Sequence, residues 1–386
     1  MFRAVAYLLT HGEEAAAARR ALVDWVELVD LLRKRAPNTL SRTRQRLPES
    51  VCQQVFHWVL ARIGEAGLVC GRTVGIDAST LEANAAMRSI VRRDSGKSYP
   101  EFLKELAQAE GISEPTAADL ARVDKKRKNK ASNADWMNPH DPEARITKMK
   151  DGRTHLAYKD EQAVDLDTGA ILAVTVQAAD TGDTQSLPVT LAQAEASLLA
   201  IKEPQVRALL PESGIEEVVT DKGYHSDETL GHCEEKGLRS YVSEPKQKRK
   251  WKGKAQKKRA YQANGRRVRG RRGKSLLRRR GELLERPFAL RLGRGDLRRA
   301  HVRGRANVHK QELLLAAAQN LGLLLRQRYG VGTPRRLAAQ GRRAQACAAG
   351  LYGALLVLLS TLWAKLRASF AAPTLGPTLG LLPSAP

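Results

Sequence analysis

Three carboxylates far apart in the chain have the residue types and settings that could do chemistry. Asp77 ends the strand-like run Thr73-Val74-Gly75-Ile76-Asp77, and Asp221 ends the run Val218-Val219-Thr220-Asp221. An apolar strand that ends in an acid delivers its carboxylate to the edge of a sheet. The third acid is Glu285. Two divalent cations held by such oxygens, roughly 3.5 to 4 Å apart, can drive phosphoryl transfer. The three acids therefore predict a site for two divalent metal ions.

Each acid taken alone has a simpler interpretation. Asp77 could only end its strand, because a helix-like Leu81-Glu82-Ala83 follows it. Asp221 could belong to a turn with Lys222 and Gly223, and Glu285 could be one solvated charge on a helix. Glu282 competes with Glu285 for the third place, and we prefer Glu285 because Arg-Pro-Phe follows it. The joint occurrence of the three acids favours the metal site.

The overall charge indicates a polyanionic partner. The chain has 386 residues, 66 Lys and Arg against 41 Asp and Glu, and a net charge of +25. Such an excess favours nucleic acid through counterion release. An apolar content of 42% is enough for a large core. The cysteines form no Cys-x-x-Cys pair, which argues against a zinc site or a disulfide framework and favours a reducing cytoplasm; they are Cys52, Cys70, Cys233 and Cys347.

A strongly basic tract runs from 246 to 280, with 18 Lys or Arg in 35 residues and no acid. Because like charges repel and there is little to bury, we expect a solvated, disordered loop that neutralises phosphates when DNA binds. Trp251 and Tyr261 are a weak case for base stacking. The tract is not a nucleotide-binding loop, since Val268 stands where a Walker A motif before Gly273-Lys274-Ser275 requires glycine.

The elements that must position the acids follow from hydrophobic periodicity. Amphipathic patterns predict helices over 13–35, 49–63, 186–200, 227–236 and 311–326. Alternating or apolar runs predict strands over 73–77, 155–164, 170–176, 216–220 and 239–243. Asp167-Thr168-Gly169 is a hairpin signal between the second and third strands. The polar segment 85–150 reads as a loop-rich insertion with one or two short helices.

This order of elements resembles the ribonuclease-H-like fold, an α/β mixed sheet flanked by helices. We expect a helical N-terminal region over 1–68, which is a candidate for DNA binding. The catalytic domain would span 69–330, with basic insertions at 85–150 and 245–281. Residues 331–386 would form a C-terminal helix and tail. Within that tail, 346–364 is apolar enough to reach membrane-spanning length, but a helix packed on the core is the preferred interpretation.

The motifs around the acids resemble those of bacterial insertion-sequence transposases of the DDE type. The resemblance rests on three stretches, Val74 to Asn84, Asp221-Lys222-Gly223-Tyr224-His225-Ser226 and Glu285-Arg286-Pro287-Phe288-Ala289, and runs from about residue 40 to 363. It implies that Asp77, Asp221 and Glu285 are the catalytic and metal-binding acids, with two Mg²⁺ or Mn²⁺ ions. It also implies cleavage at the ends of the element and strand transfer of the exposed 3′-hydroxyl. The first 36 or so residues differ from the usual beginning of the family, so we also consider that the N-terminal region is truncated.

The resemblance implies double-stranded DNA as the partner, both the terminal inverted repeats of the element and the target DNA. It also implies a homodimer on DNA, in the cytoplasm and associated with the nucleoid. The candidate DNA contacts are Lys222, Lys248, Arg249, Lys250, Arg266, Arg267, Arg286, Arg303 and Lys310. Supporting polar groups would be Asp180, Asp183 and His225. The alternative function is a catalytically inactive or domesticated DNA-binding protein derived from a transposase. A nuclease without strand transfer and a membrane-associated protein are further alternatives.

Overall fold

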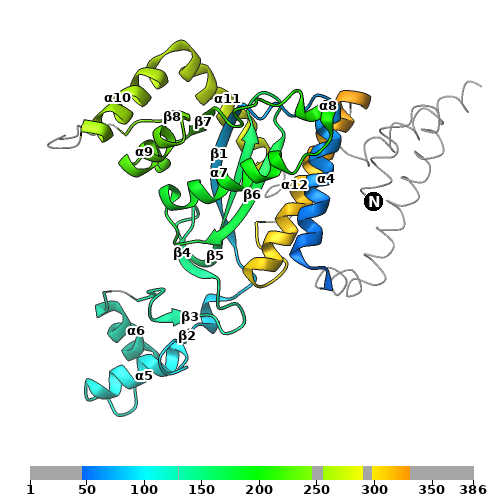
Figure 1. Ribbon diagram of the computed structural model, residues 1–386. Helices are drawn as coiled ribbons and strands as arrows, with labels where there is room; N and C mark the ends of the chain where they lie inside the picture. The colour runs from blue at the N-terminus through cyan, green and yellow to red at the C-terminus, as the bar shows by residue number, and fades with distance from the viewer. Residues whose placement is uncertain (1–45, 129, 246–254, 290–297, 331–386) are drawn as a thin grey trace, which may run out of the picture. The chain divides into compact units, whose positions relative to one another are not determined.

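A mixed sheet forms the centre of the part of the chain that the structure describes (Figure 1). The structure is a computed structural model that describes residues 46–128, 130–245, 255–289 and 298–330. The strand order is β4-β5-β1-β7-β8, with β6 also paired to β5. Strands β5 and β6 run antiparallel to their neighbours, whereas β7 and β8 are parallel to β1. The bounds are Thr73–Glu82 for β1, Arg145–Lys148 for β4, Thr154–Asp165 for β5, Ile171–Ala178 for β6, Glu217–Thr220 for β7 and Arg239–Val242 for β8.

This topology is that of a ribonuclease-H-like domain and confirms the expected fold class. An antiparallel meander of β1, β5 and β6 is followed by two parallel strands added on the other side of β1. The predicted hairpin between β5 and β6 is also present. Gly169 occupies it with a φ of 80°, a conformation that glycine adopts without steric cost, and its amide donates to the Asp165 carbonyl at 2.8 Å.

Helices cover the sheet as the periodicity predicts. Helix α7 (Asp183–Leu199) follows β6 and packs on it, and α9 (Asp227–Glu235) connects β7 to β8. Ser226 caps α9, because its hydroxyl accepts from the Thr229 amide at 3.0 Å. Helices α4 (Glu49–Glu65) and α12 (Arg305–Tyr329) lie side by side (Figure 1), and α12 also packs on β6. The short helix α8 (Pro204–Arg207) precedes β7.

The prediction of a disordered loop over the basic tract 246–280 is wrong for the residues of the tract that the structure describes. Residues Ala255–Arg269 form helix α10 and Arg271–Ala289 form helix α11. Lys and Arg are good helix formers, and specific polar contacts tie both helices to the sheet. The Asn264 side chain bonds both the amide and the carbonyl of Val242, at 2.9 and 2.8 Å, and Arg272 forms a two-point pair with the buried Glu217 at 3.1 and 2.5 Å. These contacts offset the repulsion that the sequence alone suggested.

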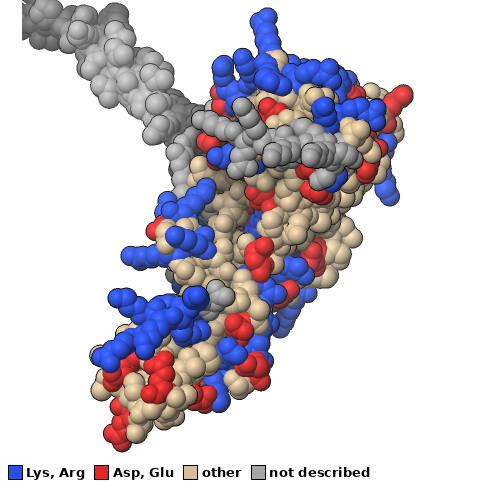
Figure 2. Space-filling view, turned by 90° about the vertical axis from the view of Figure 1, so that its left-hand side faces the viewer, with Lys and Arg blue, Asp and Glu red and all other residues tan. Residues whose placement is uncertain are grey.

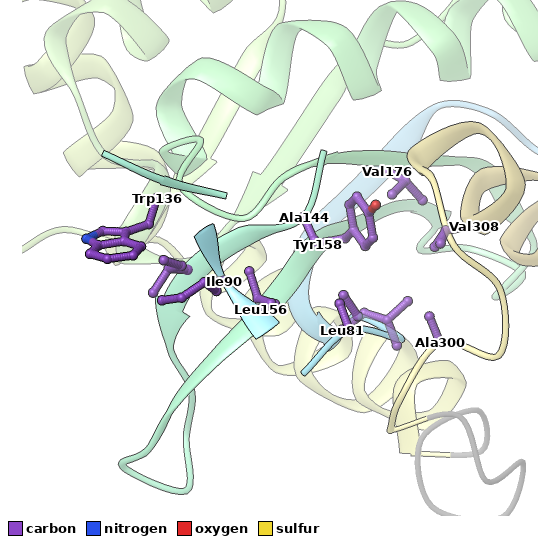
Figure 3. Packing of buried hydrophobic residues seen from close by; sticks show 12 residues of the cluster. Leu81, Ile90, Trp136, Ala144, Leu156, Tyr158, Val176, Ala300 and Val308 are labelled. Carbon is purple, nitrogen blue, oxygen red and sulfur yellow. The ribbon is translucent and has the colours of Figure 1, made fainter. Parts of the chain in front are cut away.

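The insertion after β1 folds into a small lobe. It contains helix α5 (Tyr99–Ala109), helix α6 (Ala117–Lys126), a short 3₁₀ turn η1 (Met87–Ser89) and the strand pair β2 (Val91–Arg92) and β3 (Trp136–Met137). Capping boxes begin both helices, at Ser98 and at Thr116. Trp136 joins a buried cluster with Leu81, Leu156 and Tyr158 (Figure 3). This cluster ties the lobe to the end of β1 and β5.

Several expectations fall outside the described residues. The predicted helix over 13–35, the segment 246–254 and the apolar run 346–364 are among them. In the part of the chain that the structure covers, no helix is long and apolar enough to cross a membrane.

Candidate active site

Asp77 and Asp221 lie where two parallel strands separate. The register of β1 and β7 pairs Val74 with Val218 and Gly75 with Val219, and the pairing ends there. Asp77 is two residues further along β1, and Asp221 directly follows β7. The Asp221 carboxylate accepts from the Gly223 amide at 2.9 Å and so caps the short 3₁₀ helix η2 (Lys222–Tyr224). The sheet therefore delivers both acids to one place, as the sequence predicts.

The strand that carries Asp77 is longer than expected. β1 continues through Asp77 to Glu82, pairing Asp77 with Gln162 and Glu82 with Ala157 on β5. The helix-like interpretation of the residues after Asp77 is therefore wrong, because cross-strand pairing with β5 overrides the local helix propensity of Leu81-Glu82-Ala83.

An arginine bridges the two acids. Nη2 of Arg280 lies 2.7 Å from Oδ1 of Asp77 and 3.8 Å from Oδ2 of Asp221. The Arg280 side chain is 13% exposed, against 22% for Asp77 and 44% for Asp221. Within the described residues, neither Nη2 nor Nε of this guanidinium completes a hydrogen bond of ordinary geometry. Arg280 was not among the residues that the sequence singled out, since it stands in a run of three arginines.

Burial dominates the electrostatics of Asp77. Loss of solvent raises the pKa of its carboxyl; Arg280 lowers it in part, and the neighbouring charge of Asp221 raises it further. A carboxylate in this setting is more stable when a cation is close to it. The pair of acids therefore forms a local site for positive charge.

Close packing fixes helix α11 against the strands that carry the acids. Gly75 has no side chain, and a Cβ there would lie 2.8 Å from Leu284 of α11 and 2.7 Å from Leu166. The buried Gln162 side chain donates to the Leu284 carbonyl at 3.1 Å. These contacts place Arg280, one helical turn before Leu284, over the acids.

Glu285 is exposed and directly follows the buried Leu284 on α11. Over the described ranges, no group of three His, Cys, Asp or Glu side chains is arranged to hold a metal ion. The structure thus brings two of the three predicted acids together and does not group Glu285 with them. Its assignment as the third ligand stays a prediction.

A second charged cluster lies on the opposite face of the sheet from Asp77. Glu161 and Gln162 are consecutive in β5, so their side chains point to opposite faces. Glu161 is fully buried and accepts from the hydroxyls of Ser186 at 2.6 Å, Tyr224 at 2.7 Å and Thr190. Lys159 lies beside it, donating to Ser186 at 2.7 Å and pairing with Asp183 at 2.7 Å. Burial raises the pKa of Glu161 and that of Tyr224.

This cluster supports the turn that carries Asp221. Tyr224 ends η2, so its bond to Glu161 anchors the turn to β5. A Cβ on Gly223 would collide with the Asp183 carboxylate and lie 3.1 Å from Asp221, so Asp183 packs against the same turn. Sequence reasoning missed Glu161 and Lys159; the signal was the run Lys159-Asp160-Glu161-Gln162 inside an otherwise apolar strand.

The predicted DNA contacts are found in different settings. Lys222 and Arg266 are exposed, whereas Arg267 is engaged by β8, donating to the carbonyl and hydroxyl of Ser240 at 2.9 Å each. Arg303 donates to the Asn84 carbonyl and Lys310 to that of Leu47. Lys248, Arg249 and Lys250 lie outside the described residues, and nothing is described of the Arg286 side chain.

Comparison with known proteins decides the family. The profile of the transposase DDE domain matches residues 115–331, more than half of the chain. The chain belongs to the DDE transposase family. The matched segment contains Asp221 and Glu285, and Asp77 precedes it on the strand paired with β7. No curated protein and no solved structure matched the chain.

The DDE transposase family is divalent-metal dependent, and two of the residues present suit such an ion. Asp77 and Asp221 offer the carboxylate oxygens that Mg²⁺ and Mn²⁺ prefer. In this structure the positively charged guanidinium of Arg280 lies between the two carboxylates, where a metal ion would bind. Donor chemistry and local charge therefore fit a divalent cation at the pair.

Proposed function

We propose that this protein is an active DNA transposase that cleaves the ends of an insertion sequence and joins the exposed 3′-hydroxyl to target DNA. The observation that carries the proposal is the convergence of Asp77 and Asp221 where β1 and β7 separate, in a chain of the DDE transposase family. When bound at this pair, two Mg²⁺ or Mn²⁺ ions would activate the attacking oxygen and stabilise the leaving oxygen.

The roles of the chain's own residues follow from their positions. Asp77 and Asp221 provide oxygen ligands on two strands of one rigid sheet, so the ligand geometry is set before DNA arrives. Glu285 is proposed as the third acid, supplied by α11 after a rearrangement that turns this side chain toward the pair. Lys222 directly follows Asp221 and is exposed, so it can neutralise the phosphate next to the cleaved bond.

The basic helices supply the surface on which DNA would lie. Figure 2 shows Lys and Arg side chains gathered over the region that carries α10, and again, next to acidic side chains, on the lobe with α5 and α6. Exposed cations of α10 and α11 include Lys258, Arg259, Arg266, Arg269, Arg271 and Lys274. Helix α11 also contacts the acids through Arg280. The phosphate backbone of DNA bound along this surface would therefore extend toward the site. A homodimer that pairs two element ends is part of the proposal.

Cleavage of labelled duplex DNA that carries the flanking terminal repeat tests the proposal. The wild-type protein should nick at the element boundary with Mg²⁺ or Mn²⁺ and not with EDTA. Asp221→Ala should lose at least about a thousandfold in rate while retaining DNA affinity. Glu195→Gln is a matched control, because Glu195 pairs with Lys236 on the surface. Release of nicked product without joining to target DNA would indicate a nuclease rather than a transposase.

A second candidate function is DNA binding without catalysis, as in an inactivated transposase. It is favoured by the position of Glu285, which is exposed and is not grouped with the other two acids in the described structure. In the same experiment this candidate predicts tight, salt-sensitive DNA binding with no cleavage under either metal.

A further inference from the structure

Arg280 lies on the face of α11 that packs on the sheet. Leu276, Arg280, Leu284 and Phe288 recur every four residues, and the three apolar members are buried. A guanidinium in an apolar stripe needs anionic partners, since an unpaired buried charge is strongly unfavourable. Its partners here are the two acids of the proposed site.

The arginine in turn stabilises the acid pair. Asp77 and Asp221 raise each other's energy when both are charged, and burial of Asp77 strengthens this repulsion. One guanidinium within 4 Å of both carboxylates offsets the repulsion in the absence of another cation. The incomplete hydrogen bonding of Nη2 and Nε indicates a pair held by charge more than by geometry.

We propose that Arg280 is the resident counter-ion of the acid pair and that it competes with divalent cations for the same oxygens. The proposal rests on the proposed function, in which Asp77 and Asp221 are metal ligands. Mg²⁺ binds oxygen at about 2.0–2.1 Å, and a nitrogen 2.7 Å from Oδ1 of Asp77 occupies the approach to that oxygen. Arg280 must therefore move away from Asp77 when a metal ion binds. Its presence lowers the affinity of the acid pair for the ion.

Helix α11 links this withdrawal to the third acid. Glu285 follows Arg280 by five residues, which corresponds to about 140° around the helix axis and about 7.5 Å along it. In the described arrangement Arg280 faces the pair and Glu285 faces solvent. A shift of α11 that removes the guanidinium therefore also changes where Glu285 points.

Direct titration of the full chain with Mn²⁺, without DNA and followed by electron paramagnetic resonance, tests the competition. Arg280→Gln should bind Mn²⁺ on the order of tenfold more tightly than wild type, because a competing charge is removed. Arg279→Gln is the matched control, since its guanidinium contacts Asp167 in the β5–β6 turn, and should bind as wild type does. Asp77→Asn should weaken binding in either background.

A labelling experiment on the unaltered chain covers the case in which Arg280→Gln does not fold. Phenylglyoxal modifies accessible arginines, and mass spectrometry reads each site. Modification of Arg280 should rise severalfold when Mn²⁺ replaces EDTA, while modification of Arg279 should not change.

The possible outcomes separate the competition by Arg280 from the proposed metal site itself. Unchanged or weaker Mn²⁺ binding by a folded Arg280→Gln, or labelling of Arg280 that ignores Mn²⁺, would overturn the competition and make Arg280 a structural brace. Failure of wild type and Arg280→Gln alike to bind Mn²⁺ at millimolar concentration would overturn the proposed metal site itself.

Discussion

The two faces of the sheet carry charged clusters that differ in how completely their hydrogen bonds are made. On the α7 face, Glu161 is fully buried and accepts from three hydroxyls, with Lys159 beside it. On the α11 face, Asp77 and Asp221 are partly exposed and share one guanidinium whose hydrogen bonds are incomplete. A satisfied buried network fixes structure, whereas an incompletely satisfied one can exchange its partner for a ligand. We therefore propose a structural role for the Glu161 cluster and a functional role for the acid pair.

The largest expected effect is on the α7 face. Glu161→Ala removes the acceptor of three buried hydroxyls and leaves Lys159 with Asp183 as its remaining anionic partner. We expect a loss of about 3–5 kcal/mol in the free energy of unfolding, measured by urea denaturation. Glu195→Ala, at a surface pair with Lys236, should cost about 0–1 kcal/mol. Equal losses for the two variants would refute the role assigned to Glu161.

Overpacking beneath α11 should have an intermediate effect. Gly75→Val places carbon atoms against Leu284 and Leu166 at distances that real contacts do not allow, so about 1–3 kcal/mol of stability should be lost. Because Leu284 lies on the same helix as Arg280, the variant should also disturb the acid pair. Gly231→Ala is the control, since nothing lies near a Cβ there within α9, and it should stabilise the protein by about 0.4–1 kcal/mol. No loss in Gly75→Val would mean that α11 can dock in more than one way.

The smallest expected effect is a pH dependence that distinguishes Asp77 from an ordinary capping acid. The pKa of Asp77 is raised by burial, so its charge opposes folding. Relative to Asp77→Asn, wild type should lose stability as pH rises above the usual Asp value of 3.8 and level off above the raised pKa. Bonds from Thr116 lower the pKa of Asp119 at the start of α6, so wild type should lose stability relative to Asp119→Asn as pH falls. Thermal melts in EDTA measure both slopes, and slopes of the same sign would contradict the assignment.

Much of the fold could be predicted from the sequence because its strands and helices have strong periodic patterns. Strand β7 is a short apolar run and α7 an extended helical one, and both were expected near their observed bounds. The tract containing α10 could not be predicted correctly, because its order depends on Asn264 and Arg272 meeting β8 and β7 in three dimensions. The like charges of the tract can be read from the sequence. The acid that offsets them in the fold, Glu217, is distant from the tract in the chain.

The candidate site was predictable in part for the same reason. Asp77 and Asp221 each follow an apolar run, so their convergence follows from the parallel pairing of β1 and β7. Arg280 could not be found, since two neighbouring arginines look identical in the sequence and only the docking of α11 distinguishes them. The polar run that contains Glu161 is visible in the sequence, but its hydroxyl partners on α7 and η2 could not be predicted, because they are distant in the chain.

Metal-directed cleavage of the polypeptide would show whether Asp77 and Asp221 hold a divalent ion. Fe²⁺ with ascorbate and peroxide generates radicals that cut the chain beside a bound ion, and mass spectrometry locates the cuts. We expect cuts next to Asp77 and Asp221 that are suppressed by excess Mg²⁺ and abolished in Asp77→Asn, with no cuts centred on Glu161. Cuts that persist unchanged in Asp77→Asn, or that fall elsewhere in the chain, would contradict the assignment of the acid pair as the metal site.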